Sequence, residues 1–411
     1  MTKTKILDWF KKYTMVLILV LVVAFFAITT GGKILWPQNI TNLIAQNAYV
    51  FILATGMLLC ILTGGNIDLS IGSVVCFAGA VGALLMANGV NMWIAVVVML
   101  AIGLVVGAMQ AFCIAYIKVP PFITTLAGQL IFRGLSNVVL GGMTCSVNNK
   151  AFMNIFGGGA DCYIPDFFSK FLQWFSRILS RLFHTPELTP PQSFNILCLL
   201  VGVLVCAVYV LLTLRNRSIR KKKGYAVEKL LPSLIKMIVI VAVALFVFIQ
   251  MSQYKGIPSA LIWVALVVGV YAYLTSKTTL GRYLYAIGGN EKATKLSGID
   301  TRKIYFFAYA NMGLLAGLAG IMTIARMTSA QPTYGTNYEM DAISSCFIGG
   351  ASAYGGIGTV PGVIIGAVLM GVINIGMSIM GIDQNYQKVV KGAVLLAAVI
   401  FDVMTKKNES K

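Results

Sequence analysis

Two polar side chains, Asn66 and Asp68, lie in the stretch TGGNIDLSIG, which interrupts a long apolar tract. An amide and a carboxylate at this spacing can do one of two things. Asp68 or Ser70 can cap the next helix, because a side-chain oxygen satisfies backbone donors that a helix start leaves unpaired. Alternatively, the tract breaks inside a membrane and the polar side chains line a cavity, since irregular backbone is tolerated at that depth only beside one. The residues leave both interpretations open.

The elements that must position these residues are apolar helices. Hydrophobic residues make up 58% of the 411-residue chain and charged residues 11%, against roughly 45–50% and about 25% in an average soluble domain. Several continuous apolar tracts reach the roughly 20 residues that cross a bilayer, and they do not alternate as barrel strands do. We therefore predict an all-α, multi-pass membrane protein with about twelve membrane-spanning helices, near residues 15–35, 43–63, 69–88, 91–117, 122–141, 194–214, 234–250, 258–275, 303–325, 340–357, 360–380 and 387–404.

The basic residues predict how these helices are oriented. The chain has 32 Lys and Arg residues and a formal net charge of +19. With a cytoplasmic N-terminus, most of the basic residues fall in cytoplasmic segments, as the positive-inside rule requires. We therefore expect both termini in the cytoplasm. The positive charge then faces anionic lipid of the bilayer, and no nucleic-acid partner is expected.

The sequence lacks the residue patterns of enzyme chemistry. It has no glycine-rich nucleotide loop ending in Gly-Lys-Ser/Thr and no His-Glu-x-x-His zinc motif. The single histidine, His184, lies in a polar, proline-containing segment and is not expected to bind a metal. Few charges lie inside the apolar tracts, which argues against a proton relay. An ion-coupled transporter should carry an ionisable residue near the middle of the membrane, and Arg133 and Arg326 are the best candidates for such a residue.

A second polar segment, TLGRYLYAIGGNEKATKLSGIDTRK, begins at Thr279 and is broken by glycines. Asn290 is a suitable N-cap for a short helix that runs through Glu291 and Leu296 and ends at Gly298. Such a helix between two membrane-spanning helices is either a docking element for a partner or part of a solvated loop. The residues alone do not decide between the two.

Three motifs occur in order along the chain: TGGNIDLSIGS, GRYLYAIGGNEKATKLSGI and DAISSCFIGGASAYGGIGTVPGVIIGAVLMGVIN. In this combination the chain resembles the membrane permease subunits of ribose- and xylose-type sugar ABC importers, from about Gln38 to Met404. The later stretch GMSIMGI, Gly376 to Ile382, is similar to the branch for xylose or multiple monosaccharides.

The resemblance implies a transport subunit of the bacterial cytoplasmic membrane and not an enzyme. Its path would carry a monosaccharide such as xylose or a related pentose or hexose. This chain would hold no cofactor, because a separate ABC ATPase subunit would bind ATP and Mg. The other implied partners are an extracytoplasmic sugar-binding protein and a second permease copy, giving a homodimer. An ion-coupled secondary sugar transporter is the alternative.

The resemblance also implies roles for individual residues. Residues 288–299 would be the coupling helix that fits a groove on the ATPase, through Gly288, Gly289, Asn290, Glu291, Ala293, Leu296, Ser297, Gly298 and Ile299. A sugar path also needs amide and carboxylate partners for the sugar hydroxyls, and Asn66, Asp68, Asn137 and Asn374 are the residues that we expect to supply them along the path or at its gate.

We expect one transmembrane domain over residues 1–411, with residues 279–302 as its cytoplasmic coupling segment. Residues 193–250 depart from the ribose-type pattern, because they add a helix pair joined by a basic cytoplasmic linker. Cys145 and Cys162 share one predicted loop, and they would be able to form a disulfide if that loop is outside.

Overall fold

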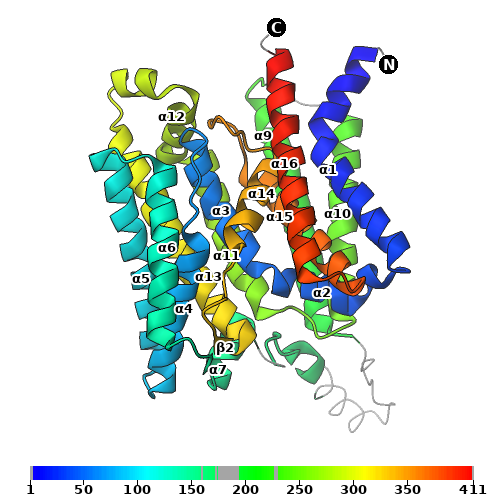
Figure 1. The fold of residues 1–411 in the computed structure, drawn as a ribbon. Coiled ribbons are helices and arrows are strands. Elements are labelled where there is room, and N and C mark those ends of the chain that lie inside the picture. Colours follow the sequence, from blue (N-terminus) through cyan, green and yellow to red (C-terminus); the bar gives the residue numbers. More distant parts are fainter. Residues whose placement is uncertain (1–2, 159–160, 172–173, 175–193, 226–229, 410–411) are drawn as a thin grey trace, which may run out of the picture. The chain divides into compact units, whose positions relative to one another are not determined.

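The structure is a computed structural model that describes residues 3–158, 161–171, 174, 194–225 and 230–409. Regular structure in these ranges is almost entirely helical (Figure 1). The exceptions are two short strands, β1 (Cys145–Ser146) and β2 (Ser329–Ala330), which pair in antiparallel fashion with Cys145 opposite Ala330. His184 and residues 226–229 of the predicted basic linker lie outside the described residues.

The chain divides into two compact units, and the larger comprises Met1–Ile34, Leu43–Cys162 and Ser259–Lys411. The 3-10 helix η1 (Lys33–Leu35) and α2 (Pro37–Gln46) fall where the sequence passes between the units. The larger unit contains α1 (Lys3–Thr29), α3 (Ala48–Leu62), α4 (Ile71–Ala87), α5 (Met92–Phe112), the π-helical turn η2 (Cys113–Ile117), α6 (Pro121–Leu140), α7 (Lys150–Phe156), α11 (Ser259–Lys277), α12 (Thr279–Leu296), α13 (Thr301–Met327), α14 (Tyr338–Ile348), α15 (Val360–Ile379) and α16 (Gln384–Glu409).

The smaller unit contains the predicted extra helix pair as α9 (Ile196–Lys222) and α10 (Leu230–Ser252), which pack against each other. Asn195 caps α9, because its Oδ1 accepts a hydrogen bond of 2.9 Å from the backbone N–H of Cys198. Gly202 of α9 faces the Phe248 ring of α10, where an added Cβ would come within 2.6 Å of the ring. A glycine therefore sets how closely the two helices approach.

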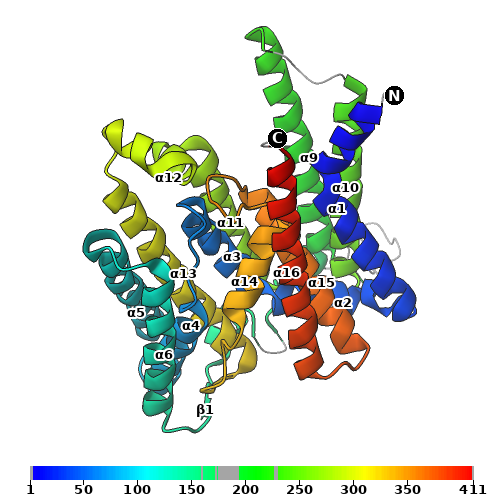
Figure 2. The same cartoon turned by 45° about the horizontal axis from the view of Figure 1, so that its top comes forward.

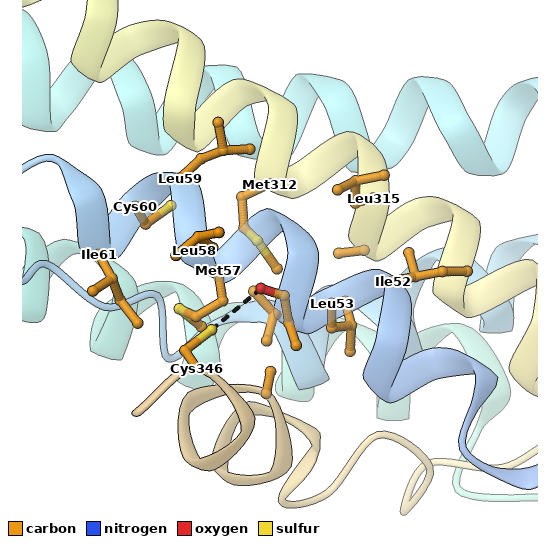
Figure 3. Close-up of a cluster of buried hydrophobic side chains, with 14 of the residues drawn as sticks. Ile52, Leu53, Met57, Leu58, Leu59, Cys60, Ile61, Met312, Leu315 and Cys346 are labelled. Atoms are coloured by element: carbon orange, nitrogen blue, oxygen red, sulfur yellow. Dashed lines mark hydrogen bonds between the residues drawn. The ribbon is translucent and has the colours of Figure 1, made fainter. Parts of the chain in front are cut away.

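Helix α3 forms the centre of the larger unit (Figure 3). All of its residues except Tyr49 are buried, which is expected of a helix that is apolar on every side. Met312 and Leu315 of α13 pack on α3, and the Cys346 thiol of α14 lies 3.2 Å from the Ala54 carbonyl oxygen. The TGGNIDLSIG stretch, which starts at Thr63, therefore follows directly after this buried helix.

The larger unit has two distinct ends (Figures 1 and 2). The start of α1, the end of α16 and the whole of α12 lie at one end, whereas β1, β2 and α7 lie at the other. Segments that the basic residues assign to the cytoplasm thus gather at one end. Cys145 and Cys162, which the sequence places in one predicted loop, are not joined by a disulfide.

Among the described residues, seven helices are long and apolar enough to cross a membrane, or eight if α2 and α3 together form one bent crossing. A helix occupies at least part of each of the predicted ranges, but this does not establish about twelve crossings.

The predicted helix at 340–357 is wrong in length. Helix α14 has only 11 residues, so it rises about 16 Å, and a bilayer core is about 30 Å thick. The helix ends just before Gly350, which has a positive φ angle that a right-handed helix cannot contain. Gly355, Gly356 and Gly358 also have positive φ angles, so the helix does not resume after it. The rest of the predicted helix is a glycine loop that returns toward the end where α12 lies (Figure 2).

Candidate functional site

The predicted capped helix is present at the end of α12. Asn290 has extended backbone angles (φ −161°, ψ 100°), which divide α12 into two helical segments. Its Oδ1 accepts a 3.0 Å hydrogen bond from the backbone N–H of Ala293, so Asn290 acts as the N-cap of the second segment. That segment ends at Ser297, and Gly298 follows with φ +85°. Glycine adopts this left-handed angle without strain.

The second segment of α12 presents most of its surface to solvent. Leu296 is 89% exposed, an unusual position for a leucine. Gly289, Asn290, Glu291, Ala293, Ser297 and Gly298 are also exposed. Ile299, by contrast, is half-buried against the hydrophobic core of its own chain. Leu296 is therefore the apolar side chain of this segment that is free to enter a groove on another protein.

The first segment of α12 is anchored by close backbone contacts. A Cβ added at Gly288 would lie 2.0 Å from the Leu62 carbonyl oxygen and 2.2 Å from the Gly356 nitrogen. The Gly356 N–H in turn donates a 3.2 Å hydrogen bond to the Leu62 carbonyl. One turn earlier, the Tyr285 hydroxyl donates a 2.7 Å bond to the Gly358 carbonyl, and burial raises the pKa of this hydroxyl. The exposed second segment of α12 thus follows a first segment that is packed closely against the rest of the chain.

The TGGNIDLSIG stretch meets the same glycine loop. Gly64 and Gly65 end α3 with positive φ angles. A Cβ added at Gly65 would lie 1.9 Å from the Ala353 carbonyl oxygen, and one at Gly355 would lie 2.5 Å from the Gly64 Cα. We call Gly64, Gly65, Gly288, Gly355 and Gly356 the glycine junction. All three sequence motifs contribute backbone to this junction.

A tyrosine also links α12 to the first motif. The Tyr305 hydroxyl lies 2.9 Å from the Thr63 carbonyl oxygen and 3.1 Å from Glu291 Oε2, and it donates to one of them at a time. Asn66 Nδ2 donates a 3.1 Å bond to the same Thr63 carbonyl. Asn66, Glu291 and Tyr305 line a cavity of about 170 Å³, together with Lys118. Asn66 and Glu291 of α12 therefore share one small polar cavity.

Asp68 lies deeper than Asn66 and is 2% exposed. Its Oδ1 accepts bonds of 2.9 Å from the Ser70 N–H and 2.7 Å from the Ser70 hydroxyl, just before α4 begins. Ser70 occupies the N-cap position, but its own side chain makes no capping bond. The Ser70 hydroxyl also lies 3.0 Å from Gln110 Oε1, and Gln110 Nε2 is buried without a partner among the described residues. Asp68 thus orders the start of α4 and also lies beside an unsatisfied amide.

The other two predicted path residues lie elsewhere. Asn137 is exposed on α6, and its Nδ2 donates a 3.1 Å bond to the Arg133 carbonyl. Asn374 of α15 lines a different cavity, of about 270 Å³. The structure therefore brings Asn66 and Asp68 into one loop and does not bring Asn137 or Asn374 to it.

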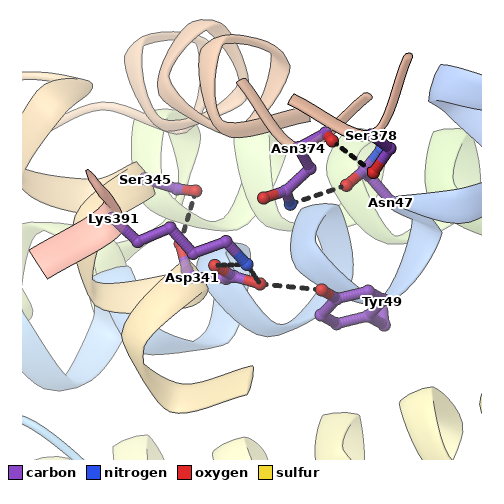
Figure 4. A network of polar contacts seen from close by, with 7 residues as sticks. All are labelled: Asn47, Tyr49, Asp341, Ser345, Asn374, Ser378 and Lys391. Atoms are coloured by element: carbon purple, nitrogen blue, oxygen red, sulfur yellow. Dashed lines mark hydrogen bonds and ion pairs between the residues drawn. The ribbon is translucent and has the colours of Figure 1, made fainter. Parts of the chain in front are cut away.

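Sequence reasoning missed a buried ion pair in the larger unit (Figure 4). Lys391 Nζ of α16 lies 2.9 Å from Asp341 Oδ1 of α14, and the Tyr49 hydroxyl donates a 2.7 Å bond to Asp341 Oδ2. The available signal was an acidic residue, Asp341, inside the apolar tract 340–357 and the basic Lys391 inside the apolar tract 387–404. Buried charges are usually paired, and the two opposite charges were suitable partners. Arg133, a candidate for ion coupling, instead donates to the Pro332 and Tyr334 carbonyls.

Comparison with known proteins identifies the family. Residues 39–399 match the family described as branched-chain amino acid transport system / permease component. The chain is 33% identical to the xylose transport system permease protein XylH of Haemophilus influenzae, over 96% of this chain and 97% of that protein. It is 31% identical to XylH of Escherichia coli, over 96% and 92%. It is also 32% identical to the ribose import permease protein RbsC of Escherichia coli, over 94% and 92%.

No solved structure matches the chain. The family match covers most of the sequence, and the similarity to these relatives extends along nearly the whole of each protein. The chain is therefore a multi-pass membrane protein and the non-catalytic subunit of a bacterial importer, and it belongs to the family of membrane permease components of ABC transporters.

Proposed function

We propose that this permease forms the translocation path of an ATP-driven importer for a monosaccharide, xylose or a related pentose or hexose. The observation that carries the proposal is the capped, solvent-facing helix from Asn290 to Gly298, seated through Gly288 on the loops of the other two motifs. The names of the relatives support a sugar, because the proteins similar over nearly the full chain are named for xylose and ribose.

The proposed mechanism begins at a partner ATPase, which holds ATP and Mg. Closure of the ATPase domains would move the helix that starts at Asn290, through residues 288–299. Because Gly288 contacts Leu62 and Gly356 directly through backbone, the motion would reach the end of α3 and the glycine loop without a flexible side chain between them. Packed elements of this kind switch between discrete arrangements and do not deform continuously.

The complete assembly has two further partners in this proposal. An extracytoplasmic binding protein delivers the sugar, and a second copy of the permease completes a homodimer. Both termini are cytoplasmic in this proposal, as the basic residues predict. The residues Asn66 and Asp68 then belong to the inner gate, close to α12. Asn374 and Asn137 line the path farther from that gate in this proposal.

Sugar uptake by reconstituted vesicles tests this function. The permease, its ATPase and its binding protein are placed in vesicles that contain ATP, and uptake of labelled D-xylose, D-ribose and L-leucine is measured. We expect uptake of a sugar that requires both ATP and the binding protein. Uptake of leucine alone would contradict the substrate class, and sugar uptake driven by an ion gradient without ATP would contradict the mechanism.

A further inference from the structure

A second cavity lies at the end of the larger unit opposite to α12. It has a volume of about 270 Å³, slightly below the range of about 300–1,000 Å³ of pockets for drug-sized ligands. Its walls come from the ends of α2, α7 and α13, the starts of α3, α11, α14 and α16, and Asn374 of α15. With α12 on the cytoplasmic side, this cavity faces the side from which the substrate arrives. Its size suits one small molecule.

The cavity wall includes an aromatic pair held by a buried charge. Tyr49 and Tyr338 stack with ring centroids 3.6 Å apart and an interplanar angle of 16°. Asp341, which is 1% exposed, accepts the Tyr49 hydroxyl and pairs with Lys391 (Figure 4). Tyr49 and Lys391 both line the cavity, and Asp341 holds them from behind. The aromatic wall and the ammonium group are therefore fixed before any ligand enters.

Asn374 contributes an unsatisfied polar atom to the same cavity. Its Nδ2 donates a 3.3 Å bond to Asn47 Oδ1 (Figure 4). Its Oδ1 is buried and has no partner among the described residues. Buried polar atoms are nearly always hydrogen-bonded in folded proteins, so an exception calls for a partner such as a ligand. A hydroxyl group in the cavity would donate to this oxygen.

We propose that this cavity is a monosaccharide-binding subsite at the outer entrance of the path; the proposal rests on the proposed function and adds the place where the delivered sugar first binds. A ring of hydroxyl groups can accept bonds from Lys391 and donate to Asn374, while its C–H face packs on a tyrosine. The described residues that line the cavity include Arg326 and Lys391 but no carboxylate. An amino acid would therefore find no carboxylate partner for its ammonium group.

Protection of an engineered cysteine tests the subsite directly. Gln387 lines the cavity, whereas the exposed Asn385 on the same helix does not. Gln387→Cys and Asn385→Cys are compared in vesicles with an impermeant maleimide, with the unmodified chain giving the background from native cysteines. We expect D-xylose to slow labelling at position 387 and not at 385, and L-leucine to slow neither. Absence of labelling at 387 without sugar would show a closed cavity and overturn the proposal.

Asn374→Leu tests the same subsite without relying on a cysteine. The variant should lower xylose uptake by roughly two- to tenfold, the effect of one lost hydrogen bond, and should weaken protection at position 387. Asn88→Leu is the matched control, because Asn88 is exposed beyond the end of α4 and does not line the cavity. Co-purification of Asn374→Leu with the ATPase shows that the variant is folded.

Two further outcomes separate this inference from the proposed function. If the complex takes up xylose but xylose protects neither cysteine and Asn374→Leu transports normally, the subsite is wrong and the proposed function stands. If the complex takes up no sugar under any condition, the proposed function fails and the subsite fails with it.

Discussion

Gly288 and Gly289 are neighbours in sequence with opposite surroundings. A Cβ at Gly288 would meet the backbone of Leu62 and Gly356, whereas a Cβ at Gly289 would meet nothing within 4 Å. Backbone atoms cannot move aside as the end of a flexible side chain can. Gly288 is therefore required by packing.

This contrast gives a prediction on stability. Gly288→Ala should destabilise the protein by about 1–3 kcal/mol, the usual cost of overpacking, and lower its thermal unfolding midpoint in detergent. Gly289→Ala is the control and should not lower it, because alanine is the better helix former. Equal midpoints for the two variants would show that the glycine junction is not tightly packed.

Asp68 gives the second prediction at this scale. Asparagine keeps an oxygen that can accept from Ser70, so Asp68→Asn should preserve folding. If Asp68 only orders the start of α4, this variant should also keep most sugar uptake, and Asp68→Ala should lose about 1–3 kcal/mol of stability, because the buried Ser70 N–H would lose its acceptor. If Asp68 lines the path, Asp68→Asn should reduce uptake at unchanged expression.

Uptake and expression are measured together in these variants. Asn91→Ala is the control for a lost side-chain hydrogen bond before a helix, because the exposed Asn91 accepts from the Trp93 N–H at the start of α5. Full uptake by Asp68→Asn would eliminate the path role.

At the scale of elements, the second segment of α12 is the best candidate for the contact with the ATPase. Glu291→Lys reverses a charge on its exposed surface, and Gly298→Val introduces a β-branched residue at φ +85°, which that residue type rarely adopts. Both variants should remain folded in the membrane but lose ATPase binding and sugar-stimulated ATP hydrolysis. Co-purification and hydrolysis in vesicles with binding protein present measure these effects.

Glu291 also contacts Tyr305, so a separate control is needed. Tyr305→Phe removes the hydroxyl that lies 3.1 Å from Glu291 Oε2 without changing the surface charge. This variant should still bind the ATPase. If Glu291→Lys and Gly298→Val both bind ATPase and hydrolyse ATP in response to sugar, the segment is not the transmission element.

The sequence predicted some elements well and others poorly, for physical reasons. The helix after Asn290 was predictable because capping is local: Asn290 and Gly298 specify its two ends. The length of α14 was not, because the apolar composition of 340–357 continues through glycines whose positive φ angles depend on contacts with distant backbone.

The residues of the two candidate sites were also hard to predict, because contacts between distant parts of the sequence bring them together. Glu291 and Asn66 lie far apart in sequence, and Tyr305 brings them to one cavity. The cavity near Asn374 is lined by residues from eight helices, which range from α2 to α16, so Tyr49 and Lys391 could not be connected by any local pattern.

At the scale of the whole molecule, sidedness links the proposals together. The glycine junction and α12 lie at one end of the larger unit, and the cavity near Asn374 lies toward the other. If the end with α12 is cytoplasmic, the ATPase contact and the sugar entrance lie on the sides that an importer needs. If it is not, both assignments fail together.

Cysteine labelling in intact cells tests this sidedness. Cysteine at Lys295 in α12, and at Lys222 at the end of α9, should be protected from an impermeant reagent, because the basic residues place both in the cytoplasm. The outer loop should be labelled near Ser169. Since the Ser169 hydroxyl donates to Asp166, its exposed neighbour Lys170 is the better position for the cysteine.

Each position reports on its own segment, because Lys295 lies in the larger unit and the other two lie in the smaller one. Labelling at 295 after the membrane is made permeable is the control for accessibility. Such labelling is expected, because Lys295 and Lys222 are exposed. Labelling at 295 from outside an intact cell would place α12 on the wrong side for an ATPase. The coupling role of the helix from Asn290 to Gly298 would then be excluded, whatever the binding measurements showed.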